Sequence, residues 1–209
     1  MPAVIFDFDG TIVDSLAGVI KVYEGVRGGS LLTAEQRRVL QNKSLLQIAR
    51  EMNIPKWKIL WLAVWGRRMF QHHMRSVQVH PGMTEIIQKL HGQKVPLYVL
   101  SANRTANVRK YLSWHKLDTY FTGIYGGASF LSKARAMDKL VRREGLNAAD
   151  VWCVGDERVD VRSAHTAGLK VIAVTWGYAS AQGLAAVNPD YLVHDSTELQ
   201  KVLQACLKK

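Results

Sequence analysis

Five short apolar segments spread along the chain constrain the fold most strongly. Turn or polar residues follow each segment, and helical patterns follow most of them. Alternation of strands and helices favours right-handed crossovers between parallel strands, so the sequence predicts a doubly wound α/β domain with a five-stranded parallel sheet. The expected strands are Ala3–Phe6, Val95–Leu100, Phe121–Tyr125, Val151–Val154 and Val171–Val174. The expected helices between and after them are Asn103–Trp114, Lys133–Glu144, Val159–Ala167 and Thr197–Leu207.

The alternation stops between the first strand and Pro81. Residues 16–78 read as helix throughout, which indicates an insertion after the first strand. We therefore predict a core of residues 1–15 and 79–209 and a small all-helical cap of residues 16–78, whose first helix Asp14 and Ser15 are expected to cap. The candidate cap helices are Leu16–Val26, Thr33–Gln41, Ser44–Met52 and Lys56–Met74.

The composition indicates whether the protein is soluble and in which compartment it is found. Hydrophobic residues make up 48% of the 209 residues, which is enough for a real core. Acid appears by Asp7, where a secretory signal or transit peptide would be basic and then apolar, and the run Ile59–Trp65 is too short to span a membrane. Cys153 and Cys206 form no CxxC pair and indicate reduced thiols. These features predict a soluble, cytoplasmic protein.

Polar side chains follow the expected strands at the points where the strands end. In an open α/β sheet, ligands bind outside the carboxyl ends of the strands, so these side chains should gather at one site. They comprise carboxylates suited to a divalent cation, hydroxyls and a lysine, which is the set that phosphoryl transfer requires. The candidates are Asp7, Asp9, Thr11, Ser101, Asn103, Arg104, Lys133, Asp156, Glu157 and Asp160.

Four motifs in order resemble those of the haloacid dehalogenase-like superfamily of aspartyl-nucleophile phosphatases. DxDGT, with an acid and a serine after it, is matched by residues 7–15; Ser101 follows the second strand; Lys133 starts a helix; and GDxxxD is matched by residues 155–160. The helical insert, the AHTAG segment at 164–168 and the VTWGY segment at 174–178 are similar to the phosphoglycolate phosphatase-like branch. The resemblance implies a Rossmann-like core carrying a helical cap.

The resemblance also implies a role for each acid and for the cation. Asp7 would be the nucleophile and Asp9 the general acid and base. Mg²⁺ would be held by Asp7, by the backbone carbonyl of Asp9 and by Asp156. Lys133 would neutralise Asp7 and the phosphoryl group, with Ser132 before it as the N-cap of its helix.

Further residues would bind phosphate or support these groups. Ser101 would donate to a phosphoryl oxygen, and Thr11, Asn103 and Arg104 are the remaining candidates for phosphate binding, although Asn103 also fits a helix cap. Gly10 would allow the turn away from the strand. Asp160 would hold Lys133 or a metal-bound water. Glu157 would lie in the outer shell around the metal ion or, as we favour, stabilise the N-terminus of the following helix.

The insert carries an unusual basic segment rich in tryptophan. Trp57, Trp61 and Trp65 recur on one helical face, and residues 28–80 hold nine Lys and Arg against two acidic residues, more than half of the net charge of +11. We favour a cap whose tryptophans form its own core and whose basic groups attract phosphoesters. An interfacial helix on anionic lipid is the weaker alternative. No nucleic-acid partner is expected, because no stacking or groove-reading motif appears.

The favoured function is therefore magnesium-dependent hydrolysis of a small phosphorylated metabolite through phospho-Asp7. By resemblance, phosphoglycolate is the substrate that we name. A β-phosphoglucomutase-like enzyme would use the same aspartates but pass the phosphoryl group to a sugar hydroxyl. A non-enzymatic, membrane-peripheral adaptor would keep the fold and use the cap for contact.

Overall fold

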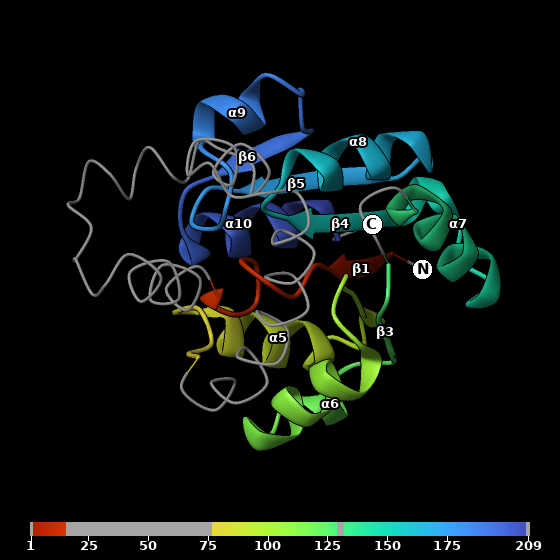
Figure 1. Ribbon diagram of the computed structural model, residues 1–209, viewed down its shortest axis with the longest axis vertical. Helices are drawn as coiled ribbons and strands as arrows, with labels where there is room; N and C mark the ends of the chain where they lie inside the picture. Colours follow the sequence, from red (N-terminus) through yellow and green to blue (C-terminus); the bar gives the residue numbers. More distant parts are fainter. Residues whose placement is uncertain (1, 16–76, 129–131, 208–209) are drawn as a thin grey trace, which may run out of the picture.

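A parallel sheet with helices on both faces forms the body of the computed structural model, which describes residues 2–15, 77–128 and 132–207 (Figure 1). The sheet has six strands in the order β3-β2-β1-β4-β5-β6. They are β1 (Ala3–Phe6), β2 (Leu97–Leu100), β3 (Gly123–Tyr125), β4 (Val151–Gly155), β5 (Lys170–Val174) and β6 (Tyr191–Val193). The predicted α/β class and all five expected strands are confirmed.

The expected count of five strands was wrong by one. The sixth strand, β6, pairs with β5 at the edge of the sheet and spans Tyr191–Val193. A segment of three residues is too short for a hydrophobic pattern to reveal it, and the exposed side chain of Tyr191 lacks the burial typical of the inner strands.

The helices include the four expected ones and two that the sequence did not predict. The expected helices are α6 (Thr105–Trp114), α7 (Lys133–Arg143), α8 (Arg158–Thr166) and α10 (Ser196–Cys206). The additional helices are α5 (Met83–Gly92) and α9 (Ala181–Ala185), and two short 3-10 helices, η2 (Asp118–Tyr120) and η3 (Ala148–Asp150), precede β3 and β4. None of the described helices has the length and apolar character needed to cross a membrane.

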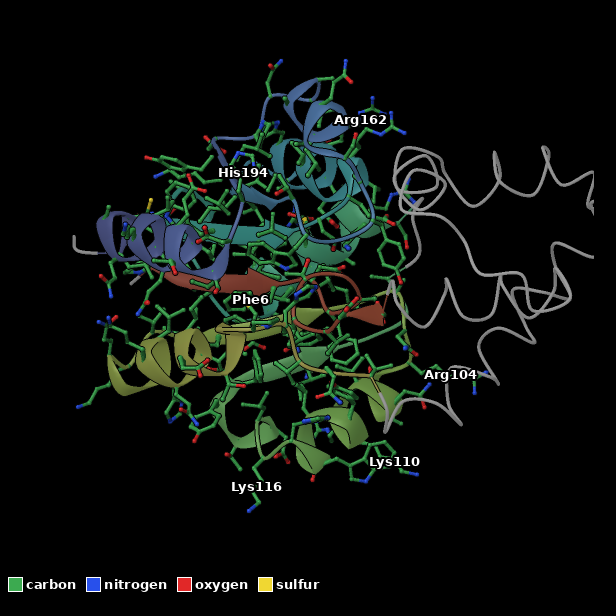
Figure 2. All side chains as sticks on the ribbon, turned by 90° about the vertical axis from the view of Figure 1, so that its left-hand side faces the viewer. Phe6, Arg104, Lys110, Lys116, Arg162 and His194 are labelled. Carbon is green, nitrogen blue, oxygen red and sulfur yellow. The ribbon has the colours of Figure 1, made fainter. Side chains whose placement is uncertain are left out.

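Side chains of alternating strand residues build one core on each face of the sheet. Val4, Phe6 and Val154 belong to the core beneath α5, α6 and α10, whereas Ile5 and Cys153 belong to the core beneath α7, α8 and α9. Burial on both faces explains why the inner strands read as continuous apolar runs. Figure 2 shows Phe6 inside the body, with Lys110, Lys116, Arg162 and His194 around its surface.

The direction of winding reverses beside β1. The chain passes from β1 to β2 and β3 on one side and then crosses to β4 on the other, so β1 and β4 are neighbours in space and in register, with Phe6 opposite Val154. Such a reversal leaves an open crevice at the carboxyl ends of the two strands, where ligands bind in this class of fold.

The described residues that flank the range 16–76 lie side by side on this body. Val13 and Val79 form an antiparallel bridge, and the amide N–H of Asp14 donates to the carbonyl oxygen of Gln78 over 2.9 Å. The amide of His80 donates to the carbonyl oxygen of Ile12 over 2.8 Å. The predicted cap helices, including the tryptophan-rich segment, lie outside the described residues.

Candidate active site

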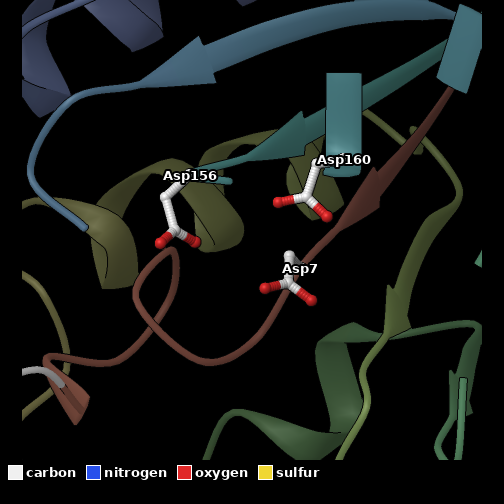
Figure 3. A group of neighbouring side chains, drawn as sticks. All are labelled: Asp7, Asp156 and Asp160. Atoms are coloured by element: carbon white, nitrogen blue, oxygen red, sulfur yellow. The ribbon is translucent and has the colours of Figure 1, made fainter. Parts of the chain in front are cut away.

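Three carboxylates converge where the winding reverses. Asp7 directly follows β1, Asp156 directly follows β4, and Asp160 lies in the first turn of α8. One oxygen from each lies within 4.8 Å of the others, and Figure 3 shows the three groups turned toward a common space. The sequence predicts the positions of Asp7 and Asp156 because each directly follows a strand whose end the apolar pattern marks.

Lys133 supplies the positive charge of the site. It is the first residue of α7, its side chain is 7% exposed, and its Nζ donates to Asp7 Oδ1 over 2.8 Å and forms an ion pair with Asp160. Although burial acts to lower it, the neighbouring carboxylates Asp160 and Asp7 raise the pKa of Lys133 above its usual value. Ser132 occupies the N-cap position as expected, and its side chain makes no capping hydrogen bond to α7.

Asp156 sits in a cradle of neutral donors and is fully buried. Thr11 Oγ1 donates to its Oδ1 over 2.7 Å, and the amide N–H of Tyr178 donates to its Oδ2 over 2.8 Å. Gly10 and Gly177 close the cradle, since a Cβ on either would lie 2.3 or 2.2 Å from Oδ2. Thr11 was predicted to bind phosphate, and the structure places its hydroxyl on Asp156 instead.

Asp9 lies beside Ser101, which is the residue that directly follows β2. Ser101 Oγ donates to Asp9 Oδ2 over 3.5 Å and accepts from the amide of Asn103 over 2.9 Å. Burial and then the negative charge of Asp7 raise the pKa of Asp9 to about 7, although hydrogen bonds from Ser101 and Ser15 lower it. A carboxyl group with a pKa near neutral suits both donation and acceptance of a proton.

Burial and neighbouring like charges disfavour the ionised forms of the other carboxyl groups in the site. Burial raises the pKa of Asp7 to about 6 despite Lys133, and burial together with Asp7 and Asp160 raises the pKa of Asp156 well above its usual range. Lys133 contacts Asp7 and Asp160, whereas Asp156 is held by neutral donors. A divalent cation among these oxygens would favour their ionised forms, and carboxylate oxygens are the ligands that Mg²⁺ prefers.

Asn103 and Arg104 directly precede helix α6. Arg104 is the N-cap residue, and its exposed side chain points away from the body (Figure 2). Asn103 Oδ1 accepts from the Arg104 amide over 2.8 Å and from Asn107 Nδ2 over 3.0 Å. The side chain of Asn103 is thus engaged with the helix, which is the alternative reading of this residue.

Glu157 stabilises the start of α8. It is the N-cap residue and forms a capping box with Asp160, whose Oδ2 accepts from the Glu157 amide over 2.9 Å. Burial, followed by the charge of Asp160, raises the pKa of Glu157 to about 8. Glu157 therefore lies at the N-terminus of α8, the position that we favoured for it.

Sequence reasoning assigned no role to Trp176, Gly177 or Tyr178, and it gave Ser15 only a role in capping the first helix of the insert. Tyr178 OH and Ser15 Oγ are 2.9 Å apart, and Trp176 Nε1 donates to the carbonyl oxygen of Thr11 over 3.2 Å. The only signal was the family-like segment VTWGY, and a spacing of more than 160 residues between partners gives no pattern that could pair them.

Comparisons with known proteins agree with this geometry. A sequence model of the family described as haloacid dehalogenase-like hydrolase matches residues 4–174. A phosphoglycolate phosphatase from Synechococcus elongatus is 32% identical, with 100% of both chains covered. A phosphoglycolate phosphatase from Vibrio parahaemolyticus is 26% identical over 96% of this chain and 95% of its own. In fold, a hydrolase of the haloacid dehalogenase-like family from Streptococcus pneumoniae is similar, with a TM-score of 0.80 at 22% identity, covering 98% of this chain and 99% of that one.

Proposed function

Since the chain belongs to the haloacid dehalogenase-like hydrolase family, in its phosphoglycolate phosphatase-like branch, we propose that it hydrolyses a small phosphate monoester through a phosphorylated Asp7. One observation carries the proposal. Asp7 lies at the switch point of the sheet, bonded to Lys133 and next to Asp156, with Asp9 two residues further along the chain. Nucleophile, cation and proton carrier therefore come together in one place.

The chemistry divides into two displacements at phosphorus. In the first, an Asp7 oxygen attacks phosphorus, the bond to the leaving oxygen breaks, and Asp9 gives that oxygen its proton. In the second, water attacks the phosphorus of phospho-Asp7, Asp9 takes the proton of the water, and the Asp7 carboxylate leaves. Lys133 stabilises negative charge on Asp7 and on the phosphoryl oxygens throughout. Ser101, whose hydroxyl lies 3.5 Å from Asp9 Oδ2, would donate to a phosphoryl oxygen of the substrate.

Asp7 and Asp156, together with the backbone carbonyl of Asp9, would hold Mg²⁺. When bound, the ion supplies positive charge that offsets the repulsion between substrate phosphate and the carboxylates. Thr11 and the Tyr178 amide fix the orientation of Asp156, so that the remaining lone pairs of its oxygens are available to a ligand. The residues present therefore suit this metal.

We also propose that residues 16–78 form the helical cap expected from the sequence. The flanking residues support an insertion, because Val13 and Val79 pair with each other on the core. A cap favours a small substrate and excludes bulk water from the acyl-phosphate. The 32% identity to a phosphoglycolate phosphatase makes phosphoglycolate the first substrate to test. The free thiols Cys153 and Cys206 support a cytoplasmic setting.

Release of inorganic phosphate from a panel of small phosphate monoesters tests the proposal. We expect turnover with Mg²⁺, with phosphoglycolate among the better substrates, and loss of turnover in excess EDTA that Mg²⁺ restores. Inorganic phosphate should be the product, rather than a second sugar phosphate. A protein that binds Mg²⁺ but releases no phosphate from any monoester would contradict the proposal.

Removal of the Asp156 charge should weaken metal binding. At a concentration about 100 times the dissociation constant, Mg²⁺ should stabilise the parent by about 2.7 kcal/mol, and Asp156→Asn should lose most of that gain. Thermal melts with Mg²⁺ and with EDTA measure the difference. The exposed Asp138→Asn is the matched control and should keep the full gain, and an undiminished gain in Asp156→Asn would contradict the assignment.

A further inference from the structure

Thr11, in the loop after β1, makes one contact with its side chain and another with its backbone. Its Oγ1 donates to Asp156 Oδ1 over 2.7 Å. Its carbonyl oxygen accepts from Nε1 of Trp176, just beyond the end of β5, over 3.2 Å. Thr11 and Asp156 are both fully buried. Two hydrogen bonds through Thr11 therefore connect the indole of Trp176 to a candidate metal ligand at the end of β4.

The indole of Trp176 is held in place by its surroundings. It packs against the core beneath α5, α6 and α10, and its ring centroid lies 5.7 Å from that of His80. The amide of His80 in turn donates to the carbonyl oxygen of Ile12 over 2.8 Å. Trp176 and His80 thus hold two successive carbonyl groups of the loop after β1. A buried carbonyl that loses its donor is costly, so removal of the indole N–H should displace the backbone at Thr11.

Hydrogen bonds to both oxygens set the orientation of the Asp156 carboxylate. Oδ2 accepts from the amide of Tyr178 over 2.8 Å, and the main chain fixes the direction of that donor. Oδ1 accepts from the hydroxyl of Thr11, which rotates with its side chain and moves with its loop. Outer hydrogen bonds of this kind aim the lone pairs of a ligand at its metal ion. The Thr11 hydroxyl is therefore the adjustable donor, and Trp176 is placed to fix it.

We propose that Trp176 is a positioning residue of the metal site. Its indole N–H fixes the backbone at Thr11, and the Thr11 hydroxyl then fixes the orientation in which Asp156 meets Mg²⁺. The inference rests on the proposed function and adds to it a residue outside the four motifs. Trp176 acts through Thr11 and not as a ligand of the metal.

Two substitutions at position 176 remove the N–H donor. Trp176→Phe keeps an aromatic ring but reduces its volume. Trp176→benzothienylalanine keeps the shape of the indole and replaces the N–H by sulfur, so it separates loss of the hydrogen bond from loss of packing. Trp152→Phe is the matched control, because Trp152 is a buried tryptophan near the start of β4 whose ring lies beside Tyr191 and Lys170.

Isothermal titration calorimetry with Mg²⁺ measures the Kd of the metal without any turnover, and thermal melts in EDTA show that each variant is folded. Both changes at position 176 should raise Kd about 10-fold, whereas Trp152→Phe should leave it unchanged within about twofold. Thr11→Val removes the hydroxyl and should raise Kd by about 10-fold or more. In a Thr11→Val background, Trp176→Phe should change Kd by less than about twofold, because both act through one hydroxyl.

Two results would overturn the inference while leaving the proposed function intact. One is an unchanged Kd in the benzothienylalanine variant, which decides alone if Trp176→Phe does not fold. The other is an equal fold-change with Thr11 present and in the Thr11→Val background, which would reveal a merely structural effect. A parent that binds Mg²⁺ but releases no phosphate would contradict the proposed function and leave this test in force, whereas a parent that binds no Mg²⁺ would contradict both.

Discussion

Asp7→Asn should lower kcat for phosphate release by about 10⁴-fold or more. An amide does not attack phosphorus as a carboxylate does, and Asp160, the other described carboxylate that pairs with Lys133, is held in the capping box of α8. Asp9 is two residues away and faces Ser101, and Asp156 is enclosed by Thr11 and the Tyr178 amide. Steady-state release from phosphoglycolate measures the loss.

The fold should survive this substitution. The pKa of Asp7 is raised to about 6 by burial, so the neutral amide replaces a charge that the protein already destabilises. Lys133 keeps its ion pair with Asp160. Asp138→Asn, at an exposed ion pair on α7, is the control and should retain full activity. Ordinary turnover in a folded Asp7→Asn protein would exclude Asp7 as the nucleophile.

Lys133→Met should damage both catalysis and stability. Loss of the cation leaves Asp7 and Asp160 buried without their partner, and breaking a buried pair costs about 3–5 kcal/mol. For a chain of this size, that corresponds to a fall in melting temperature of roughly 6–20 °C. Loss of the positive charge near the phosphoryl group should lower kcat by about 10³-fold. Thermal melts and phosphate release measure the two effects.

The loss of stability in Lys133→Met should depend on pH in a defined direction. In EDTA, the Asp7 carboxyl group, whose pKa burial raises to about 6, binds a proton as the pH falls, which removes its repulsion with Asp160 in the folded state of the variant. The difference in unfolding free energy from the parent should therefore be larger at pH 8 than at pH 5. Lys139→Met, on the exposed side of the same helix, should show neither effect. A Lys133→Met protein as stable and as active as the parent would contradict the role of this lysine.

The sequence predicted those parts of the fold that burial on two faces makes visible. The strand ending at Phe6 appears with the predicted bounds because apolar residues fill both of its faces. The edge strand at Tyr191 and the helix α9 are too short to show a period, whereas the buried residues Met83, Ile86, Ile87 and Leu90 of α5 have helical spacing that the prediction missed. Local pattern thus predicts the centre of the sheet better than its edge.

In the candidate site too, some residues could be predicted from the sequence and others could not. Asp7, Asp156 and Lys133 follow from motifs at strand ends and a helix start, and the structure brings them together. The hydrogen bond from the Thr11 hydroxyl to Asp156 was not predicted. Neither was the contact between the hydroxyls of Tyr178 and Ser15, which are 163 residues apart in the sequence. Contacts of this kind depend on how loops pack, for which a single sequence carries no periodic signal.

The most direct test is to trap the phosphoryl group on the enzyme. Parent protein with Mg²⁺ and phosphoglycolate is quenched in acid during turnover, digested, and analysed by mass spectrometry. We predict one phosphoryl group on the peptide that contains Asp7, its loss on treatment with hydroxylamine, and its absence from Asp7→Asn. A phosphoryl group on another residue, or none on any peptide at any time while turnover proceeds, would contradict catalysis through phospho-Asp7.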